Sequence, residues 1–338
     1  MGFFSLTKEL AVDLGTANTI IIHDGKIVVN QPSIVAVDSA GKLIAVGSRA
    51  QEMEGREPPN IRTVRPLRKG VIADYNAAEQ MIRGLIKMAT SRNSWFSPSL
   101  RMVIGIPSGS TEVEIRAVRD SSEQANGRDV YMIYEPMAAA LGIGLDVQAP
   151  EGNMIVDIGG GTTEIAVISL GGIVSNRSIA IAGDDITEDI VNHMRTKHSV
   201  NVGVRTAEQI KIKVGSALPK LDDEPEDFIV HGPNLMTGLP LEIPVSYREV
   251  SQAIEGSIKK IETAVLQALQ ATPPELYADI VKNGIWLAGG GALIRGLDKR
   301  LSDKIGIKFH VAEDPLLSVA NGTGVALSNI DNFSFLIR

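Results

Sequence analysis

Residues 154–170 read MIVDIGGGTTEIAVISL: an apolar run that ends at Asp157, three glycines, two threonines and a second apolar run. The pattern predicts a strand, a tight turn and a second strand. Glycines in such a turn let backbone N–H groups come within hydrogen-bonding distance of an anion, and Asp157 can hold a hydrated Mg²⁺. A β-run follows the glycines where a Rossmann or P-loop would continue into a helix. The stretch therefore indicates a phosphate-binding hairpin, with a plain glycine-rich hairpin as the alternative.

A second copy of the pattern lies near the start of the chain. Residues 10–25 read LAVDLGTANTIIIHDG, with an apolar run, Asp13, Gly15 and Thr16, and another apolar run closed by an Asp-Gly turn. A repeat of this kind predicts two similar halves. Each half would offer one carboxylate and one phosphate hairpin to a shared cleft, so that the two hairpins clamp a polyphosphate from both sides.

Two further stretches carry polar groups at strand ends. Glu135 follows the predicted strand 130–134, and strand ends in an open α/β sheet face the ligand crevice. We therefore interpret Glu135 as the residue that orients an attacking water, while a charge that complements a helix N-terminus is the alternative. Residues 285–301 read IWLAGGGALIRGLDKRL, a strand and glycines that continue into a helix suited to a nucleotide's flat or anionic parts.

Bulk composition limits the class of protein. The length of 338 residues favours two domains. A net charge of −7 and a pI of about 5.4 argue against a general nucleic-acid-binding face. The absence of cysteine excludes a disulfide scaffold and fits a reducing compartment. No apolar run reaches the roughly 18 residues that span a bilayer, and the N-terminus lacks a secretory signal. The five histidines show no metal-ligand spacing.

Two aromatic pairs stand in segments where no core periodicity demands them. Phe3 and Phe4 precede the first predicted strand, and Trp95 and Phe96 lie in the polar stretch SRNSWFSPSL. Exposed aromatic pairs mark interaction surfaces, and burying each ring gains roughly 1.5–3 kcal/mol. The two segments together favour contact with a membrane. A tail folded onto the body and a ring pair packed over a nearby helix are the alternatives.

The remaining elements are less specific. Thr206 and Gln209 fit a capping box at the start of a helix, and Glu208 and Lys211, three residues apart, share one face of it. Residues 47–70 are polar and loop-like, and residues 219–245 are expected to form a small β appendage. An apolar stripe predicts one long amphipathic helix over 247–271.

Five motifs in this order, DLGTANT, EPMAAA, VDIGGGTTEIAV, AEQIK and LAGGGALIRGLD, closely resemble the bacterial MreB family, the rod-shape-determining branch of the actin, heat-shock chaperone and sugar kinase superfamily. The resemblance covers essentially the whole chain. It implies an α/β actin-like ATPase fold, in which two duplicated α/β domains flank a nucleotide cleft and each carries a small subdomain. The implied domains are 1–145, with a subdomain near 33–67, and 146–338, with one near 182–245. The C-terminal helix, about 315–330, is expected to pack back on the first domain.

The resemblance also implies roles for residues at matching positions. The two hairpins would bind the phosphates of ATP or ADP through Gly15, Thr16, Ala17 and Asn18, and through Gly159, Gly160, Gly161, Thr162 and Thr163. Mg²⁺ would be coordinated, largely through water, by Asp13 and Asp157. The hydrolytic water would be polarised by Glu135, with Asp157 and Thr162 beside it. The ribose and adenine would be contacted by Glu208, Gln209, Ile210 and Lys211, against a wall of Gly290, Gly291, Ala292, Leu293 and Ile294.

The implied function is an ATP-binding cytoskeletal protein with slow hydrolysis. It would polymerise head to tail into filaments, paired antiparallel, on the inner face of the cytoplasmic membrane, and would act with the cell-wall elongation machinery. Its location would be cytoplasmic and peripherally membrane-associated. A sugar kinase would need a second acid facing a sugar pocket, and a chaperone ATPase would need a following substrate domain; neither is evident. A plasmid- or organelle-positioning actin-like filament without membrane affinity is the open alternative.

Overall fold

A computed structural model describes residues 7–90 and 99–338 of the 338-residue chain. The first half builds a five-stranded mixed sheet in the order β10-β9-β1-β2-β3. Its first three strands form an antiparallel meander, while β9 and β10 add in parallel on the other side of β1. The strands are β1 (Thr7–Leu14), β2 (Asn18–His23), β3 (Lys26–Pro32), β9 (Ser99–Ile106) and β10 (Gly127–Tyr134).

The second half repeats this arrangement strand for strand. Its sheet has the order β13-β12-β11-β16-β17, again an antiparallel meander followed by two parallel additions beside its first strand. The strands are β11 (Asn153–Ile158), β12 (Thr163–Ser169), β13 (Gly172–Ile179), β16 (Ile285–Ala288) and β17 (Phe309–Val311). The duplicated α/β architecture predicted from the repeated Asp-Gly hairpins is confirmed.

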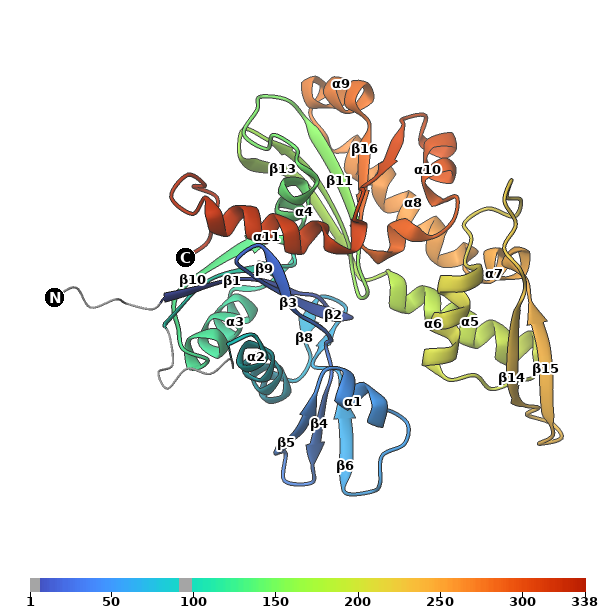
Figure 1. Cartoon of the computed structure of the whole chain (residues 1–338). Helices are drawn as coiled ribbons and strands as arrows, with labels where there is room; N and C mark the ends of the chain where they lie inside the picture. Colours follow the sequence, from blue (N-terminus) through green and yellow to red (C-terminus); the bar gives the residue numbers. More distant parts are fainter. Residues whose placement is uncertain (1–6, 91–98) are drawn as a thin grey trace.

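A pair of helices lies between the two sheets. Helix α4 (Glu135–Ile143) packs against α11 (Ser318–Ser328), which runs across the middle of the molecule in Figure 1. One apolar cluster joins both helices to residues of both sheets, for example Val103 and Ile155. Because this layer covers the inner faces, β12 is buried along its entire length, as expected of a strand covered on both sides.

Other helices cover the outer faces of the sheets. Helices α2 (Tyr75–Thr90) and α3 (Glu112–Gln124) close the core of the first half, and α8 (Glu255–Gln270) packs against β12 and β13 of the second. The second half is completed by α9 (Pro274–Asn283), α10 (Leu297–Ile305) and two short 3₁₀ turns, η1 (Gly290–Leu293) and η2 (Pro315–Leu317).

Two smaller lobes project from this body, as Figure 1 shows. The lobe at the bottom of the view has a three-stranded sheet, β5-β4-β6, and one short helix: β4 (Val35–Asp38), β5 (Leu43–Val46), α1 (Ser48–Met53) and β6 (Ile61–Val64). A two-stranded hairpin, β7 (Leu67–Arg68) and β8 (Val71–Ile72), connects it to the body. The lobe at the right contains α5 (Gly183–His198), α6 (Val204–Val214), β14 (Phe228–Pro233), β15 (Pro240–Val245) and α7 (Tyr247–Ala253).

Three local predictions were wrong. The segment 247–271 forms two helices, α7 and α8, that meet at Ile254. Helix α6 begins at Val204 after Gly203, with no side-chain cap, so the capping box expected at Thr206 does not exist. The segment 47–70, expected to be a loop, contains α1, β6 and β7, because charged residues there alternate with apolar ones that pack inward, such as Ala50 and Leu67.

Candidate functional site

The two glycine hairpins face each other between the halves of the molecule. A Cβ atom placed on Gly160 would lie 2.8 Å from the Ala17 side chain, and one on Gly161 would lie 2.9 Å from the Thr16 side chain. Within the second hairpin, the Gly159 N–H donates to the Thr162 carbonyl at 2.9 Å. Only glycine lets the two hairpins come this close. The two copies of the sequence pattern therefore form two backbone loops that face each other.

Three carboxyl groups gather at the base of these hairpins. Asp13 lies in β1, Asp157 in β11, and Glu135 begins α4. Burial raises the pKa of Asp13 to about 7. Burial, with repulsion from Asp13 and Glu164, raises the pKa of Asp157 to about 8. The pKa of Glu135 also lies well above its ordinary value, first through burial and then through repulsion from Asp13 and Asp157.

This carboxyl cluster has the chemistry of a divalent-cation site. All the influences on the three pKa values raise them, and no lysine or arginine of the described chain is among those influences. Carboxylate oxygens are the donors that Mg²⁺ prefers, and Mg²⁺ retains several waters. A cation among the three carboxylates would offset their mutual repulsion. The residues present therefore fit Mg²⁺.

The first turn of α5 lies against the second hairpin. The Asp184 N–H donates to the Gly160 carbonyl at 2.8 Å, and the Gly183 N–H donates to the Gly159 carbonyl at 3.1 Å. The Lys211 ammonium of α6 donates to the Gly183 carbonyl at 2.9 Å. Lys211, expected to contact the ribose and adenine, is thus connected through the first turn of α5 to the hairpin expected to bind phosphate.

Glu208 and Lys211 pair with each other on α6. The Lys211 Nζ lies 2.7 Å from the Glu208 carboxylate, and both contact the hydroxyl of Thr187, at 3.0 and 2.6 Å. Between them on α6, Gln209 is exposed, while Ile210 is fully buried in the core. The structure therefore brings Glu208 and Lys211 to the site as a pair and directs Ile210 away from it.

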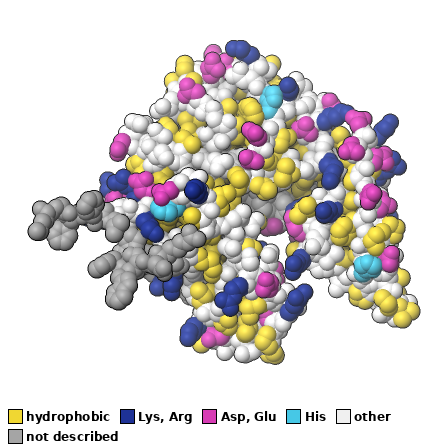
Figure 2. Space-filling view, viewed as in Figure 1, with side chains coloured by type: hydrophobic (Ala, Val, Ile, Leu, Met, Phe, Trp, Pro, Cys, Tyr) yellow, Lys and Arg dark blue, Asp and Glu magenta, His cyan; other side chains and the backbone are white. Residues whose placement is uncertain are grey.

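The third glycine stretch, expected to form a wall against the adenine, is the turn η1. Gly290 and Leu293 are exposed, while the side chains expected beside them, Ala292 and Ile294, are buried. The next residue, Arg295, joins this turn to the segment after α6, since its carbonyl accepts from the Ala217 N–H at 2.8 Å. Figure 2 shows the surface hollowed between the lobe that carries α1 and the lobe that carries α5 and α6.

Two contacts across the halves escaped sequence reasoning. The Glu164 carboxylate, buried in β12, accepts hydrogen bonds from the Ser108 N–H at 3.2 Å and from the Ser178 hydroxyl at 2.6 Å. An acid inside an otherwise apolar strand was the available signal. The second contact is an ion pair of 3.2 Å between Lys69 and Asp185. No local motif marks it, because its members lie 116 positions apart.

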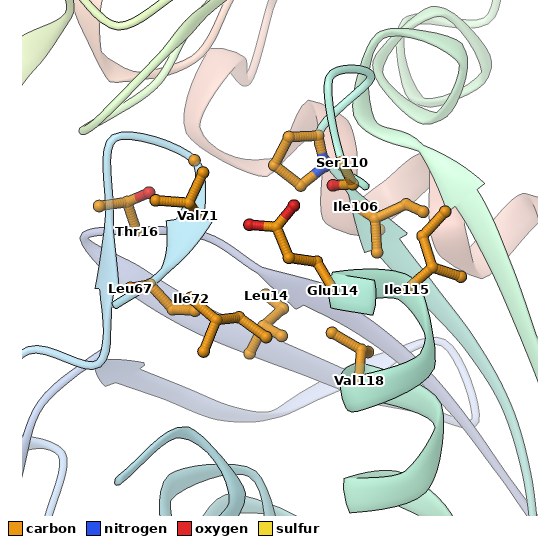
Figure 3. A pocket seen from close by; sticks show the side chains of 13 residues that line it. Leu14, Thr16, Leu67, Val71, Ile72, Ile106, Ser110, Glu114, Ile115 and Val118 are labelled. Carbon is orange, nitrogen blue, oxygen red and sulfur yellow. The ribbon is translucent and has the colours of Figure 1, made fainter. Parts of the chain in front are cut away.

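An apolar pocket opens behind the first hairpin. Figure 3 shows it between Thr16 and the β7–β8 hairpin on one side and α3 on the other, with the Glu114 carboxylate directed into it. Its floor is made by Leu14, Leu67 and Ile72, among other apolar residues. The pocket adjoins the first phosphate hairpin at Thr16.

The four aromatic residues expected to contact a membrane, Phe3, Phe4, Trp95 and Phe96, lie outside the described residues. Among the helices of residues 7–90 and 99–338, none combines the length and apolar character needed to cross a bilayer.

Comparison with known proteins decides the family. The family model described as MreB/Mbl protein matches residues 7–334. The chain belongs to the MreB/Mbl family. It is 47% identical over 336 residues to the cell shape-determining protein MreB of Escherichia coli (strain K12), covering 98% of this chain and 95% of that protein. It is 44% identical over 326 residues to the cell shape-determining protein Mbl of Bacillus subtilis (strain 168), covering 96% and 97%.

Solved structures give the same fold. MreB 5 of Spiroplasma citri bound to AMPPNP is 36% identical, with a TM-score of 0.89 over 96% of this chain and 97% of that one. The MamK double helical filament, 22% identical, has a TM-score of 0.78 over 94% and 97% and supports the fold alone. The actin-like fold class and the MreB resemblance inferred from the sequence are confirmed.

Proposed function

We propose that this chain binds ATP or ADP with Mg²⁺ between its two halves and hydrolyses ATP slowly. The observation that carries the proposal is the pair of opposed glycine hairpins, with Asp13, Asp157 and Glu135 at their base. Nucleotide-bound structures of a relative, MreB5 of Spiroplasma citri with AMPPNP and with ADP, support it.

Each residue has a separate task in this proposal. The hairpins, Gly15 to Asn18 and Gly159 to Thr163, bind the phosphates through backbone N–H and threonine hydroxyl groups. Asp13 and Asp157 hold Mg²⁺, which when bound neutralises phosphate charge. Glu135 orients the attacking water and accepts its proton as a general base. Thr162, nearby on the second hairpin, assists in placing that water.

The base and the sugar of the nucleotide would be recognised by α6 and by the turn η1. Glu208 and Lys211 contact the ribose and adenine, with Gln209 and the backbone of Ile210 beside them, and the turn Gly290 to Ile294 faces them.

We also propose the domain division 1–145 and 146–338, with subdomains 33–67 and 182–245. The packing of α11 on α4 and β1 is consistent with a C-terminal helix that returns to the first domain.

At the level of the assembly, we propose a cytoplasmic, peripherally membrane-associated actin-like filament that directs cell shape together with the cell-wall elongation machinery. The curated relatives are named as cell shape-determining proteins. The protofilaments would pair antiparallel, and the membrane contacts would come from Phe3, Phe4, Trp95 and Phe96. A positioning filament without membrane affinity is the alternative, and lipid binding separates the two.

The hydrolysis proposal is tested by Glu135→Gln. This substitution keeps the shape of the side chain and removes the base, so phosphate release from ATP should fall by roughly 10²–10⁴-fold. Nucleotide affinity and ATP-dependent pelleting of filaments should persist. Glu112→Gln, at an exposed carboxylate that begins α3, is the control and should retain the wild-type rate. An unchanged rate in Glu135→Gln would contradict the assignment of the base.

A further inference from the structure

Two histidines and a glutamate meet at one point far along α5 from the nucleotide site. The Nε2 of His193 lies 2.7 Å from Oε1 of Glu249, and the Nε2 of His198 hydrogen-bonds to the same oxygen. One potential ligand atom from each of the three residues lies within 4.8 Å of the others. The side chains are 12–21% exposed, so the group is partly shielded and still reachable from solvent.

The fold creates this cluster in a way that sequence spacing does not reveal. Residues five apart point about 140° away from each other around a regular α-helix. His198, however, is the last residue of α5, and Ser199 after it takes a left-handed conformation with φ of 53°. Helix α7 packs against α5, and the Ser246 hydroxyl accepts from the Glu249 N–H at 3.3 Å, which places Glu249 in the first turn of α7. The lack of metal-ligand spacing among the histidines is therefore not informative here.

The chemistry of the three groups matches a borderline divalent metal. The Glu249 carboxylate offers an oxygen donor beside two imidazole nitrogens, and imidazole and carboxylate are both ligands of Zn²⁺. The ammonium of Lys197, 3.3 Å from the same oxygen, is half exposed and can turn away to solvent.

Histidine and carboxylate ligands hold Zn²⁺ at about 2.0–2.2 Å in a tetrahedron, which separates the ligand atoms by roughly 3.3 Å. The present separations from Glu249 are somewhat shorter. A small rotation of the Glu249 side chain would therefore open the space that an ion needs.

We propose that His193, His198 and Glu249 bind one Zn²⁺ ion, with a fourth coordination position open to water. Three protein ligands and one open position form a recognised zinc arrangement. The site is separate from the Asp13 and Asp157 cluster, whose oxygen donors suit Mg²⁺. A bound ion would tie the C-terminal end of α5 to α7. The N-terminal turn of the same α5 holds the Gly159–Gly160 hairpin, so the ion would stiffen a helix that reaches the nucleotide site.

The test is a metal titration of the chelator-treated full chain in excess Mg²⁺, which fills oxygen-only sites. Co²⁺, used as a visible probe, should bind with a stoichiometry of about one and give a visible absorption band that Zn²⁺ abolishes by displacement. Zn²⁺ should also raise the midpoint of thermal unfolding, because a ligand that binds only the folded state stabilises it. Removing a residue that only hydrogen-bonds to a metal ligand lowers metal affinity about 10–100-fold. His193→Gln and His198→Gln should each lower Zn²⁺ affinity at least that much.

The matched control is His231→Gln, at an exposed histidine of β14 that lies 3.8 Å from Glu242. It should bind Zn²⁺ as the wild type does. Glutamine can still donate a hydrogen bond to Glu249, and circular dichroism checks that each variant is folded. Crystals grown with Zn²⁺ should show an anomalous peak among the three side chains. The proposal is overturned if the wild type takes up no Co²⁺ or Zn²⁺ saturably, if the anomalous peak lies elsewhere, or if folded His193→Gln and His198→Gln bind as tightly as His231→Gln.

Discussion

At the scale of single residues, Asp157 makes stability depend on pH. Its pKa rises from 3.8 to about 8 on folding. Below 3.8 the carboxyl group is protonated in both the folded and the unfolded chain, so it contributes no difference. Between 3.8 and about 8 the unfolded chain releases the proton while the folded chain retains it, so rising pH favours unfolding. A neutral side chain at this position should remove that cost.

We therefore expect Asp157→Asn to stabilise the protein freed of metal and nucleotide. At the alkaline end of this window the apparent free energy of unfolding should increase by about 1 kcal/mol or more, since one pKa unit corresponds to about 1.36 kcal/mol. Urea unfolding at a series of pH values, with a chelator present, measures it. Asp331→Asn, at an exposed aspartate, is the control and should leave the pH dependence as it is. Equal pH slopes for wild type and Asp157→Asn would refute the argument.

At the residue scale, the sequence predicted which residues come together where a motif is contiguous. Asp13, Asp157 and the glycines stand in hairpins whose residue types determine the turn, and the structure brings them together; their role in nucleotide binding stays a proposal. Glu164 and the His193 cluster were not predicted, because their meaning depends on partners from distant elements. No local pattern encodes which side chain lies opposite.

At the scale of elements, the crossing of α4 and α11 depends on glycine. A Cβ on Gly322 would lie 1.6 Å from the Ala138 carbonyl oxygen, and one on Gly142 would lie 1.9 Å from the Ser318 carbonyl oxygen. The helix backbones are therefore in direct contact. Helix α4 begins with Glu135, so this crossing also determines where the proposed catalytic carboxylate lies.

We expect Gly322→Ala to destabilise the protein by about 1–3 kcal/mol or more, since the extra methyl group must push two backbones apart. Gly324→Ala, two residues along the same helix, meets nothing within 4 Å and is the matched control. It should stabilise the helix by roughly 0.5–1 kcal/mol, because alanine loses less entropy than glycine. Thermal unfolding of the two variants should thus shift in opposite directions, and a shift of the same sign in both would contradict this account.

Element prediction failed where tertiary contacts overrode the pattern. The apolar stripe over 247–271 is continuous, and it predicted one helix. The chain instead turns at Ile254, so that α7 packs on α5 while α8 packs on β12 and β13. Both helices bury an apolar face, but they bury it against different elements. Apolar periodicity alone does not show whether a segment packs as one helix on one surface or as two helices on two surfaces.

At the scale of the whole molecule, polar contacts between described residues connect the two halves of the duplicated fold. The Lys69–Asp185 ion pair and the Ser108–Glu164 hydrogen bond both span the proposed cleft. A nucleotide bound between the halves would add contacts to each of them. Both halves pack against the apolar layer formed by α4 and α11.

Assembly should also decide how well the proposed aromatic anchors hold lipid. One chain would present the proposed anchors Phe3, Phe4, Trp95 and Phe96 once, whereas a filament presents many copies at once and gains avidity without new contacts. In liposome co-sedimentation with ATP, the intact chain should bind as a filament far better than as a monomer. Trp95→Ser/Phe96→Ser should lose binding while still forming filaments by electron microscopy.

Tyr277→Ser/Val281→Ser, which removes two partly exposed apolar side chains of α9, is the matched control for that experiment and should bind lipid normally. Each other outcome has a definite meaning. Unchanged binding of Trp95→Ser/Phe96→Ser would move the anchor to Phe3 and Phe4, because those residues would then be the remaining aromatic pair. Failure of the intact chain to bind would favour a positioning filament without membrane affinity, since slow ATP hydrolysis and polymerisation require no lipid. A monomer that pelleted as well as the filament would refute avidity as the basis of membrane attachment.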